Sequence, residues 1–355
     1  MLTFAEIPGV EISIALLIFL GFAIGMTSGF IGVGGGFALT PALIILGFPA
    51  NFAVGTSMSY ITGTSIISAI RHRQLGNIDP KLGILMIIGM LLGVEVGIRI
   101  LNWVNVLGLA DTVVLTLSII VLTAIGIFTF VETSKKKVQL DEMLKRGEAV
   151  PRDLSSSPLV KRIQCLHIPP MIDFPKSRIS VSLWIILGIG LFTGTLAGII
   201  GIGGGFIMMP SLIYLLGVPS IMAVGTNIFQ IIFSGAFGCI RHSMSGNVII
   251  IAAFITIFGA CIGTQIGSLG TRFVRGLSVR FVLSYSIFFF ALASSLKLIS
   301  IITGKGTGWL QTAPLLIIFI GLGLMMLVIA MLFVMGIRYN HGSSVPQWLV
   351  TFLAR

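Results

Sequence analysis

The sequence predicts an all-α polytopic membrane protein built from two inverted-topology repeats, with broken or short helices near glycine-rich segments. Three observations support this fold class. Of the 355 residues, 56% are hydrophobic and only 9% are charged, whereas a soluble domain usually carries about 25% charged residues. The apolar residues form runs of membrane-spanning length, and the motif GxGGGF occurs twice. This composition excludes soluble globular, disordered and collagenous proteins.

The apolar runs define the order of the elements. Most of them approach the ~20 residues that a helix needs to cross a bilayer, and none alternates like a strand of a β-barrel. The second run of each half is too short to cross, so we expect it to continue a broken helix or to be re-entrant. The runs cover residues 12–31, 37–47, 52–70, 82–101 and 112–131, and then 181–200, 205–217, 222–240, 248–269, 281–302 and 311–337.

The domain boundaries follow from these runs. The stretch before the first run contains Glu6 and Glu11 but no lysine or arginine. It therefore lacks the positive region of a secretory signal, and we expect the first run to be a retained span. The polar stretch at 132–180 is rich in proline and serine, which indicates a flexible tether with a short helix over 138–148. A regulatory or partner-binding role is the alternative. The expected domains are a first transmembrane repeat (1–131), a linker (132–180), a second transmembrane repeat (181–303), and an extra C-terminal transmembrane helix with its tail (304–355).

The positive charges predict the orientation in the membrane. If every run changes side, all but four of the 22 lysines and arginines fall on one face. Cytoplasmic loops collect such residues. We therefore expect a multi-pass protein of the cell inner (cytoplasmic) membrane, with the N-terminus outside and the 132–180 loop and the C-terminus in the cytoplasm. The net charge of +11 is explained by these loops, so the bilayer rather than nucleic acid is the expected partner. Of the four exceptions, Arg241 and Lys305 fall on the outside. The other two, Arg99 and Lys297, lie within spans or at their ends.

The two halves repeat the same motifs in the same order. GFIGVGGGFALTP at 29–41 corresponds to GIIGIGGGFIMMP at 198–210, and AVGT at 53–56 corresponds to AVGT at 223–226. Five apolar elements per half, joined by a linker on one side, place the halves in the membrane in opposite senses. Inverted repeats are typical of secondary transporters, although some channels also have them. Further matching positions are Gly89, Gly93 and Gly97 with Gly259, Gly263 and Gly267.

The glycine motifs are the first candidate site. Glycine costs about 1 kcal/mol per residue inside a helix, so we expect each helix to break here and a short helix to begin afterwards. A helix N-terminus has free N–H groups and a partial positive charge, which suit an anion. Close helix packing is the alternative explanation. A dinucleotide loop is disfavoured because no soluble strand precedes the motif and no ribose-binding acid follows it. The expected substrate-binding glycines are Gly34, Gly35, Gly36, Gly203, Gly204 and Gly205.

Polar side chains in the following span extend this site. Hydroxyl and amide groups can donate hydrogen bonds to an oxyanion, or they can join helices to one another. Arg71-His72 and Arg241-His242 recur at a helix exit, where they either attract anions at the two mouths or stabilise the helix C-terminus. The expected substrate-binding residues are Thr56, Ser57, Thr226, Asn227 and Gln230.

The distribution of acids favours an anionic substrate. No Asp or Glu follows Asp173, whereas a cation pathway usually needs carboxylates. Glu95 lies deep inside a span, and its repeat counterpart is Gln265. An intramembrane carboxylate is a candidate for proton coupling; a neutral or hydrogen-bonded structural role is the alternative.

Enzymatic and metal-dependent functions find no support in the sequence. The chain contains no His-Glu-x-x-His, Gly-x-Gly-Asp, Gly-x-Ser-x-Gly or Walker motif. The three cysteines, Cys165, Cys239 and Cys261, are too few and too scattered for a disulfide framework or a zinc cluster. We therefore expect no catalytic residue, no cofactor and no metal.

The order GxGGGF…P, AVGT and RH…GN, present in both halves, resembles the TauE/SafE family of sulfite exporters and related anion transporters. The resemblance covers roughly residues 12–131 and 182–301. It implies movement of small sulfur-containing anions, such as sulfite and organosulfonates, across the cytoplasmic membrane. Combined with the inverted repeats, this predicts a secondary transporter that works by alternating access around a midplane site. A proton is the candidate coupling ion, and a homo-oligomer is compatible with the sequence. An anion channel with the same broken helices and a membrane sensor or scaffold are the alternatives.

Overall fold

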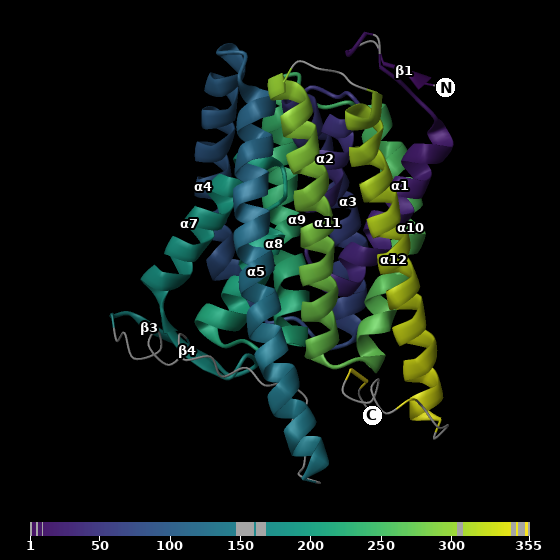
Figure 1. The fold of residues 1–355 in the computed structure, drawn as a ribbon. Coiled ribbons are helices and arrows are strands. Elements are labelled where there is room, and N and C mark those ends of the chain that lie inside the picture. The colour runs from purple at the N-terminus through teal and green to yellow at the C-terminus, as the bar shows by residue number, and fades with distance from the viewer. Residues whose placement is uncertain are drawn as a thin grey trace.

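The computed structural model describes residues 2–4, 6–8, 10–146, 160, 168–303, 308–341, 346 and 352–353. It is a helical bundle (Figure 1). Eight of the described helices are long and apolar enough to cross a membrane, which confirms the helical, multi-pass prediction. The helices are α1 (Ile14–Ile31), α2 (Gly36–Ile45), α3 (Ala50–Gln74), α4 (Pro80–Val106), α5 (Ala110–Lys145), α7 (Leu183–Ile200), α8 (Gly205–Ser211), α9 (Ser220–Met244), α10 (Ile250–Gly270), α11 (Gly276–Thr303) and α12 (Gly308–Asn340).

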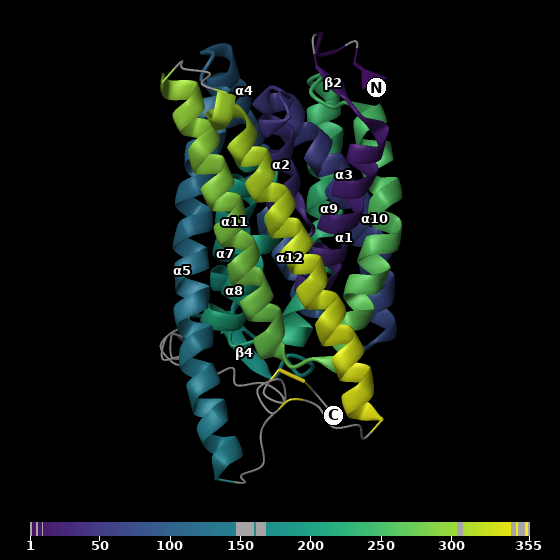
Figure 2. The same ribbon diagram turned by 45° about the vertical axis from the view of Figure 1, so that its right-hand side comes forward.

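The helices run between two faces of the bundle. We call the end where α1 begins the N-terminal face and the opposite end, where α5 finishes, the linker face; they are the top and bottom of Figure 1. Helix α1 runs inward from the N-terminal face, α2 turns back toward it, and α3, α4 and α5 then cross in alternating directions (Figure 2). Helix α8 continues as the π-helix Leu212–Leu216, so the short apolar helices α2 and α8 occupy the second position of each half, where short elements were expected.

Glycines allow two pairs of helices to pack very closely. Helix α1 packs along α10, and α4 packs along α7. A methyl group at Gly25 of α1 would lie 2.8 Å from Cα of Ala260, and one at Gly190 of α7 would lie 2.8 Å from the Met86 carbonyl oxygen. Only glycine permits backbones to approach this closely in a membrane. Each pair joins one helix from either half of the chain. The same contacts involve Gly21, Gly29, Gly259, Gly263 and Gly267 in the first pair, and Gly89, Gly93, Gly97, Gly194 and Gly198 in the second.

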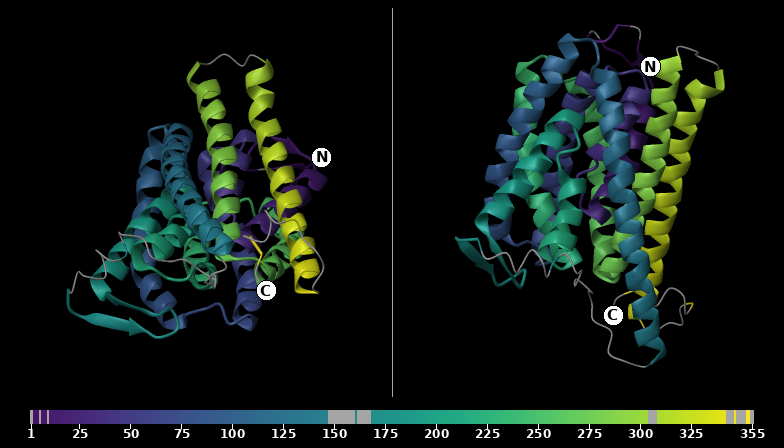
Figure 3. Two further views of the ribbon diagram at one scale, coloured as in Figure 1. Left: turned by 60° about the horizontal axis from the view of Figure 1, so that its bottom comes forward. Right: turned by 60° about the vertical axis from the view of Figure 1, so that its left-hand side comes forward.

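Two regions differ from the expected helical pattern. Helix α5 continues without a break to Lys145, so the helix expected over 138–148 is the end of α5, and it projects beyond the bundle (Figure 3). Residues 147–159 and 161–167 of the linker lie outside the described residues, as do Lys305 and Cys165. Two antiparallel strand pairs were not anticipated: β1 (Leu2–Thr3) with β2 (Glu11–Ile12), and β3 (Met171–Phe174) with β4 (Ile179–Ser182).

Candidate functional site

The glycine motifs break the helices where the sequence predicts. Helix α1 ends at Gly32 and α7 ends at Gly201, with φ of +84° and +76°. Helices α2 and α8 then begin after Gly35 and Gly204, whose φ angles are +79° and +72°. An L side chain would be strained in this left-handed region. No side chain caps either new N-terminus, so first-turn N–H groups are left without a side-chain acceptor.

The two breaks lie back to back inside the bundle. A methyl group at Gly36 would lie 2.7 Å from the Gly201 carbonyl oxygen, and one at Gly205 would lie 2.5 Å from the Val33 carbonyl oxygen. The rings of Phe37 and Phe206, which follow the two breaks, have centroids 6.2 Å apart. The structure therefore brings the six predicted glycines of both halves together.

Ile61 of α3 and Ile231 of α9 pack against both breaks. Each of these side chains lies within 3.4 Å of a methyl group placed at Gly34 or at Gly203. Sequence reasoning missed them, although they occupy the same place in the two repeats, five residues after AVGT. They make the centre of the site partly aliphatic.

Asn227 of α9 links the two breaks directly. Its Nδ2 donates hydrogen bonds to the Gly32 carbonyl oxygen at 2.7 Å and to the Gly205 carbonyl oxygen at 2.8 Å. Its Oδ1 accepts a hydrogen bond of 2.9 Å from Nε2 of Gln230. Both side chains are fully buried. One amide thus holds the end of α1 against the start of α8, which belong to different halves of the chain.

Two of the predicted substrate-binding side chains each carry a buried polar atom that has no hydrogen-bond partner among the described residues. These atoms are Oε1 of Gln230 and Oγ of Ser57, which is the repeat counterpart of Asn227. A buried polar atom without a hydrogen bond costs about 1–3 kcal/mol, so such atoms call for an explanation. They are available to a ligand with hydrogen-bonding groups.

Thr56 and Thr226 each accept a hydrogen bond from the turn before a helix of the other half. Oγ1 of Thr56 accepts a hydrogen bond of 3.1 Å from the backbone N–H of Ile249, just before α10. Oγ1 of Thr226 accepts one of 3.0 Å from the backbone N–H of Asp79, just before α4. The two turns lie toward opposite faces, because α10 begins at the N-terminal face and α4 begins at the linker face. Each threonine joins the two halves, and their contact with a substrate remains a prediction.

The two Arg-His pairs have unequal surroundings. His72 and His242 are both fully buried, and Nε2 of His72 lies 3.4 Å from the Gly29 carbonyl oxygen. Arg71 donates a hydrogen bond of 2.9 Å to Oε1 of Gln74, while its buried Nε has no partner among the residues that the structure describes. The capture of anions by these pairs remains a prediction.

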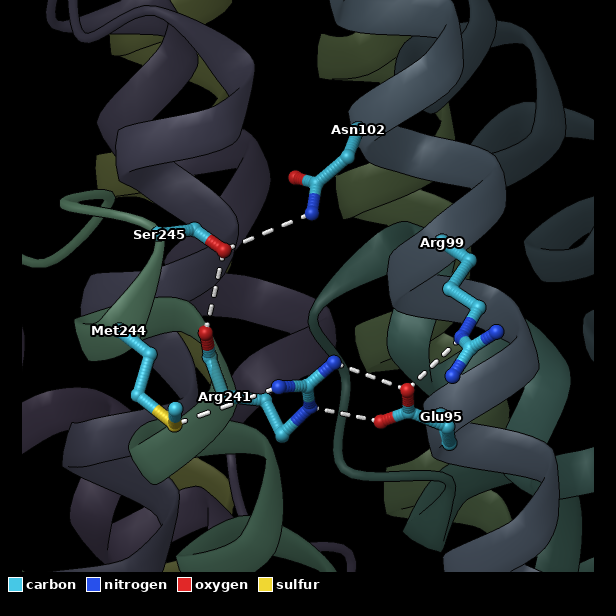
Figure 4. A network of polar contacts seen from close by, with 6 residues as sticks. All are labelled: Glu95, Arg99, Asn102, Arg241, Met244 and Ser245. Carbon is cyan, nitrogen blue, oxygen red and sulfur yellow. Dashed lines mark hydrogen bonds and ion pairs between the residues drawn. The ribbon is translucent and has the colours of Figure 1, made fainter.

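Arg241 forms an ion pair with Glu95 (Figure 4). Its Nε lies 2.7 Å from Oε2 and its Nη2 lies 2.8 Å from Oε1, a bidentate geometry. Nε of Arg99 also lies 2.8 Å from Oε1 of Glu95. The carboxylate predicted either to couple protons or to have a structural role therefore has two cationic partners, and it joins α4 to α9. The contact was missed because 146 residues separate the partners.

The fold and this buried polar centre define a polytopic membrane protein whose helices are broken in pairs at the contact between two halves. The sequence profile of the family described as "Sulfite exporter TauE/SafE" matches residues 17–298. The chain therefore belongs to the TauE/SafE family, a family of membrane transporters rather than enzymes.

Curated relatives agree with this assignment. The chain is 25% identical over 264 residues to the probable membrane transporter protein YunE of Bacillus subtilis, covering 72% of this chain and 88% of the relative. It is 27% identical over 285 residues to the probable membrane transporter protein YjnA of the same organism, covering 80% of this chain and 98% of the relative. No solved structure gives a significant match. Within the described residues, no group of three or more His, Cys, Asp or Glu side chains is placed to hold a metal ion.

Proposed function

We propose that this chain is a secondary transporter that moves small sulfur-containing anions, such as sulfite and organosulfonates, by alternating access. The observation that carries the proposal is the amide of Asn227, which holds the glycine breaks of the two halves together. The family description names sulfite, and the absence of acids after Asp173 favours an anion over a cation.

The anion site lies at the meeting point of the two breaks. First-turn amides of α2 and α8 supply N–H donors and a favourable dipole. The hydroxyl of Ser57 supplies a further donor, since it has no partner among the described side chains and backbone groups. In the closed arrangement seen here these groups are buried, so an anion reaches them only when the halves move apart.

The two halves act as inverted repeats in this proposal. The exchange of partners between halves, α1 with α10 and α4 with α7, supports it. Rocking of one unit against the other opens the centre first to one face and then to the other. The N-terminal face is outside and the linker face is cytoplasmic, in accordance with the distribution of lysine and arginine. A proton is the proposed coupling ion, and Glu95 is the intramembrane carboxylate to test for that role.

Concentrative uptake into proteoliposomes tests the proposal. With an imposed proton gradient, the purified protein should accumulate labelled sulfite above its external concentration. Flux that only follows the gradient of sulfite itself would identify an anion channel. Complete absence of flux for sulfite and organosulfonates, by a protein shown to be folded, would favour a sensor or scaffold.

A further inference from the structure

A cavity of about 380 Å³ opens at the linker face. Its lining comes from three separate segments: the end of α3, the turn from α3 to α4, and the turn of the β3–β4 hairpin, with one residue of α9. Sequence reasoning assigned no role to any of these residues. They are Arg73, Gly76, Ile78, Pro80, Lys176 and Phe229.

Two contacts fix the β3–β4 hairpin at this place. Oγ of Ser177 donates a hydrogen bond of 2.7 Å to Oδ2 of Asp79, the residue before α4. Nζ of Lys81 donates one of 2.9 Å to the Asp173 carbonyl oxygen and lies 5.4 Å from the ring centroid of Phe174. The hairpin is therefore attached to the start of α4. This attachment brings Lys176 to the same cavity as Arg73, which is far from it in the sequence.

The cavity has a positive lining. Arg73 and Lys176 are both exposed, and neither has an ion-pair partner among the described residues. The nearby carboxylate of Asp79 is buried and accepts hydrogen bonds from Ser177 and from the backbone N–H of Leu82 at 3.3 Å. Its charge is thus directed into the fold, and two cations remain facing the opening.

Phe229 brings α9 to the wall of the cavity. It directly precedes Gln230 in α9 and lies against α4, because a methyl group at Gly83 would lie 2.7 Å from its Cδ1 atom. Its ring also makes an edge contact with Phe233, at a centroid distance of 5.5 Å. The cavity therefore touches α9, the helix that carries Asn227 and Gln230.

The geometry points to a vestibule at the linker face, beside the helix that carries Asn227 and Gln230, in which Arg73 and Lys176 capture a small oxyanion. This inference rests on the proposed function, because it supplies the same site with its substrate. Two convergent cations raise the local concentration of anions and their rate of association, and the effect decreases as salt screens the charges.

Sided flux measurements test the vestibule. In proteoliposomes, the double variant R73Q/K176Q should raise the KM for sulfite entering from the linker face by about tenfold. It should leave the maximal rate and the KM from the N-terminal face unchanged. The matched control is R272Q/R338Q, which removes the same charge from exposed positions of that face outside the cavity. An unchanged KM in R73Q/K176Q, or an equal rise of the KM in both double variants, overturns the vestibule. Either result leaves the proposed function standing as long as the wild type transports sulfite.

Equilibrium binding separates the two claims. In nanodiscs of neutral lipid, sulfite should bind the wild type about tenfold more tightly than R73Q/K176Q, whether or not the protein transports sulfite. If sulfite binds in this way and the wild type shows no flux, the anion-binding cavity is supported and the proposed transport function is refuted. Nanodiscs with phosphatidylglycerol identify the other source of an oxyanion. If native mass spectrometry shows lipid retained only by the wild type, and sulfite fails to displace it, a lipid headgroup occupies the cavity and the vestibule is refuted.

Discussion

Substitution of Gly36 tests whether the two glycine breaks must touch. A methyl group at Gly36 would lie 2.7 Å from the Gly201 carbonyl oxygen and 2.9 Å from Cα of Ile202, where ordinary contacts are 3.4–4 Å. Both neighbours are backbone atoms, which cannot rotate away. Gly36→Ala therefore forces a displacement of roughly 0.7 Å, and overpacking of this kind costs about 1–3 kcal/mol.

Gly188→Ala is the matched control. It introduces the same methyl group into α7, where nothing lies within 4 Å. Alanine is better than glycine inside a helix by about 1 kcal/mol, so this variant should be as stable as the wild type or more stable. In mixed micelles, the free energy of unfolding of the two variants should differ by about 2–4 kcal/mol. In proteoliposomes, only Gly36→Ala should lose sulfite uptake. The reasoning fails if Gly36→Ala unfolds like Gly188→Ala and transports normally.

Five further substitutions test individual contacts. Asn227→Ala removes three buried hydrogen bonds of about 0.6 kcal/mol each, so unfolding measurements should show a loss of about 2 kcal/mol together with loss of uptake; normal uptake would dismiss Asn227 as the link. Glu95→Gln and Arg241→Gln should lower thermal stability non-additively in a double-mutant cycle, and strictly additive effects would count against their ion pair. If Glu95 carries the proton, Glu95→Gln should also abolish proton-driven uptake. Uptake that still depends on the proton gradient in this variant would rule out that role. Thr56→Val and Thr226→Val should each cost about 1 kcal/mol of stability and, as predicted substrate-binding residues, should each raise the KM for sulfite; an unchanged KM would remove them from the anion site.

The sequence predicts the helices and their breaks well because both depend on local chemistry. Apolar runs specify spans in lipid, and consecutive glycines favour a break wherever they occur, as Gly32 and Gly201 confirm. The continuation of α5 to Lys145 was missed because polarity marks the end of a membrane span and does not by itself end a helix.

Contacts distant in sequence were less accessible. Nothing local indicates that Lys176 would join Arg73, since the hairpin that carries it is attached through a side-chain contact with Asp79. The Glu95–Arg241 pair had a signal that was not used: the arginine recurs in both repeats, and the acid occurs in only one. Thr56 and Thr226 share a motif and yet accept hydrogen bonds from turns at opposite faces, before α10 and before α4, which the local sequence does not reveal.

The KM of Ser57→Ala tests the central claim most directly. The hydroxyl of Ser57 is buried and has no partner among the described residues, so its removal should cost the folded protein no stability. A hydrogen bond to a charged group contributes about 1.5–3 kcal/mol, and its loss should raise the KM for sulfite about tenfold or more. Ser118→Ala, which removes a hydroxyl bonded to the Val114 carbonyl oxygen in α5, should leave the KM unchanged. An unchanged KM in Ser57→Ala would contradict an anion site at the paired glycine breaks.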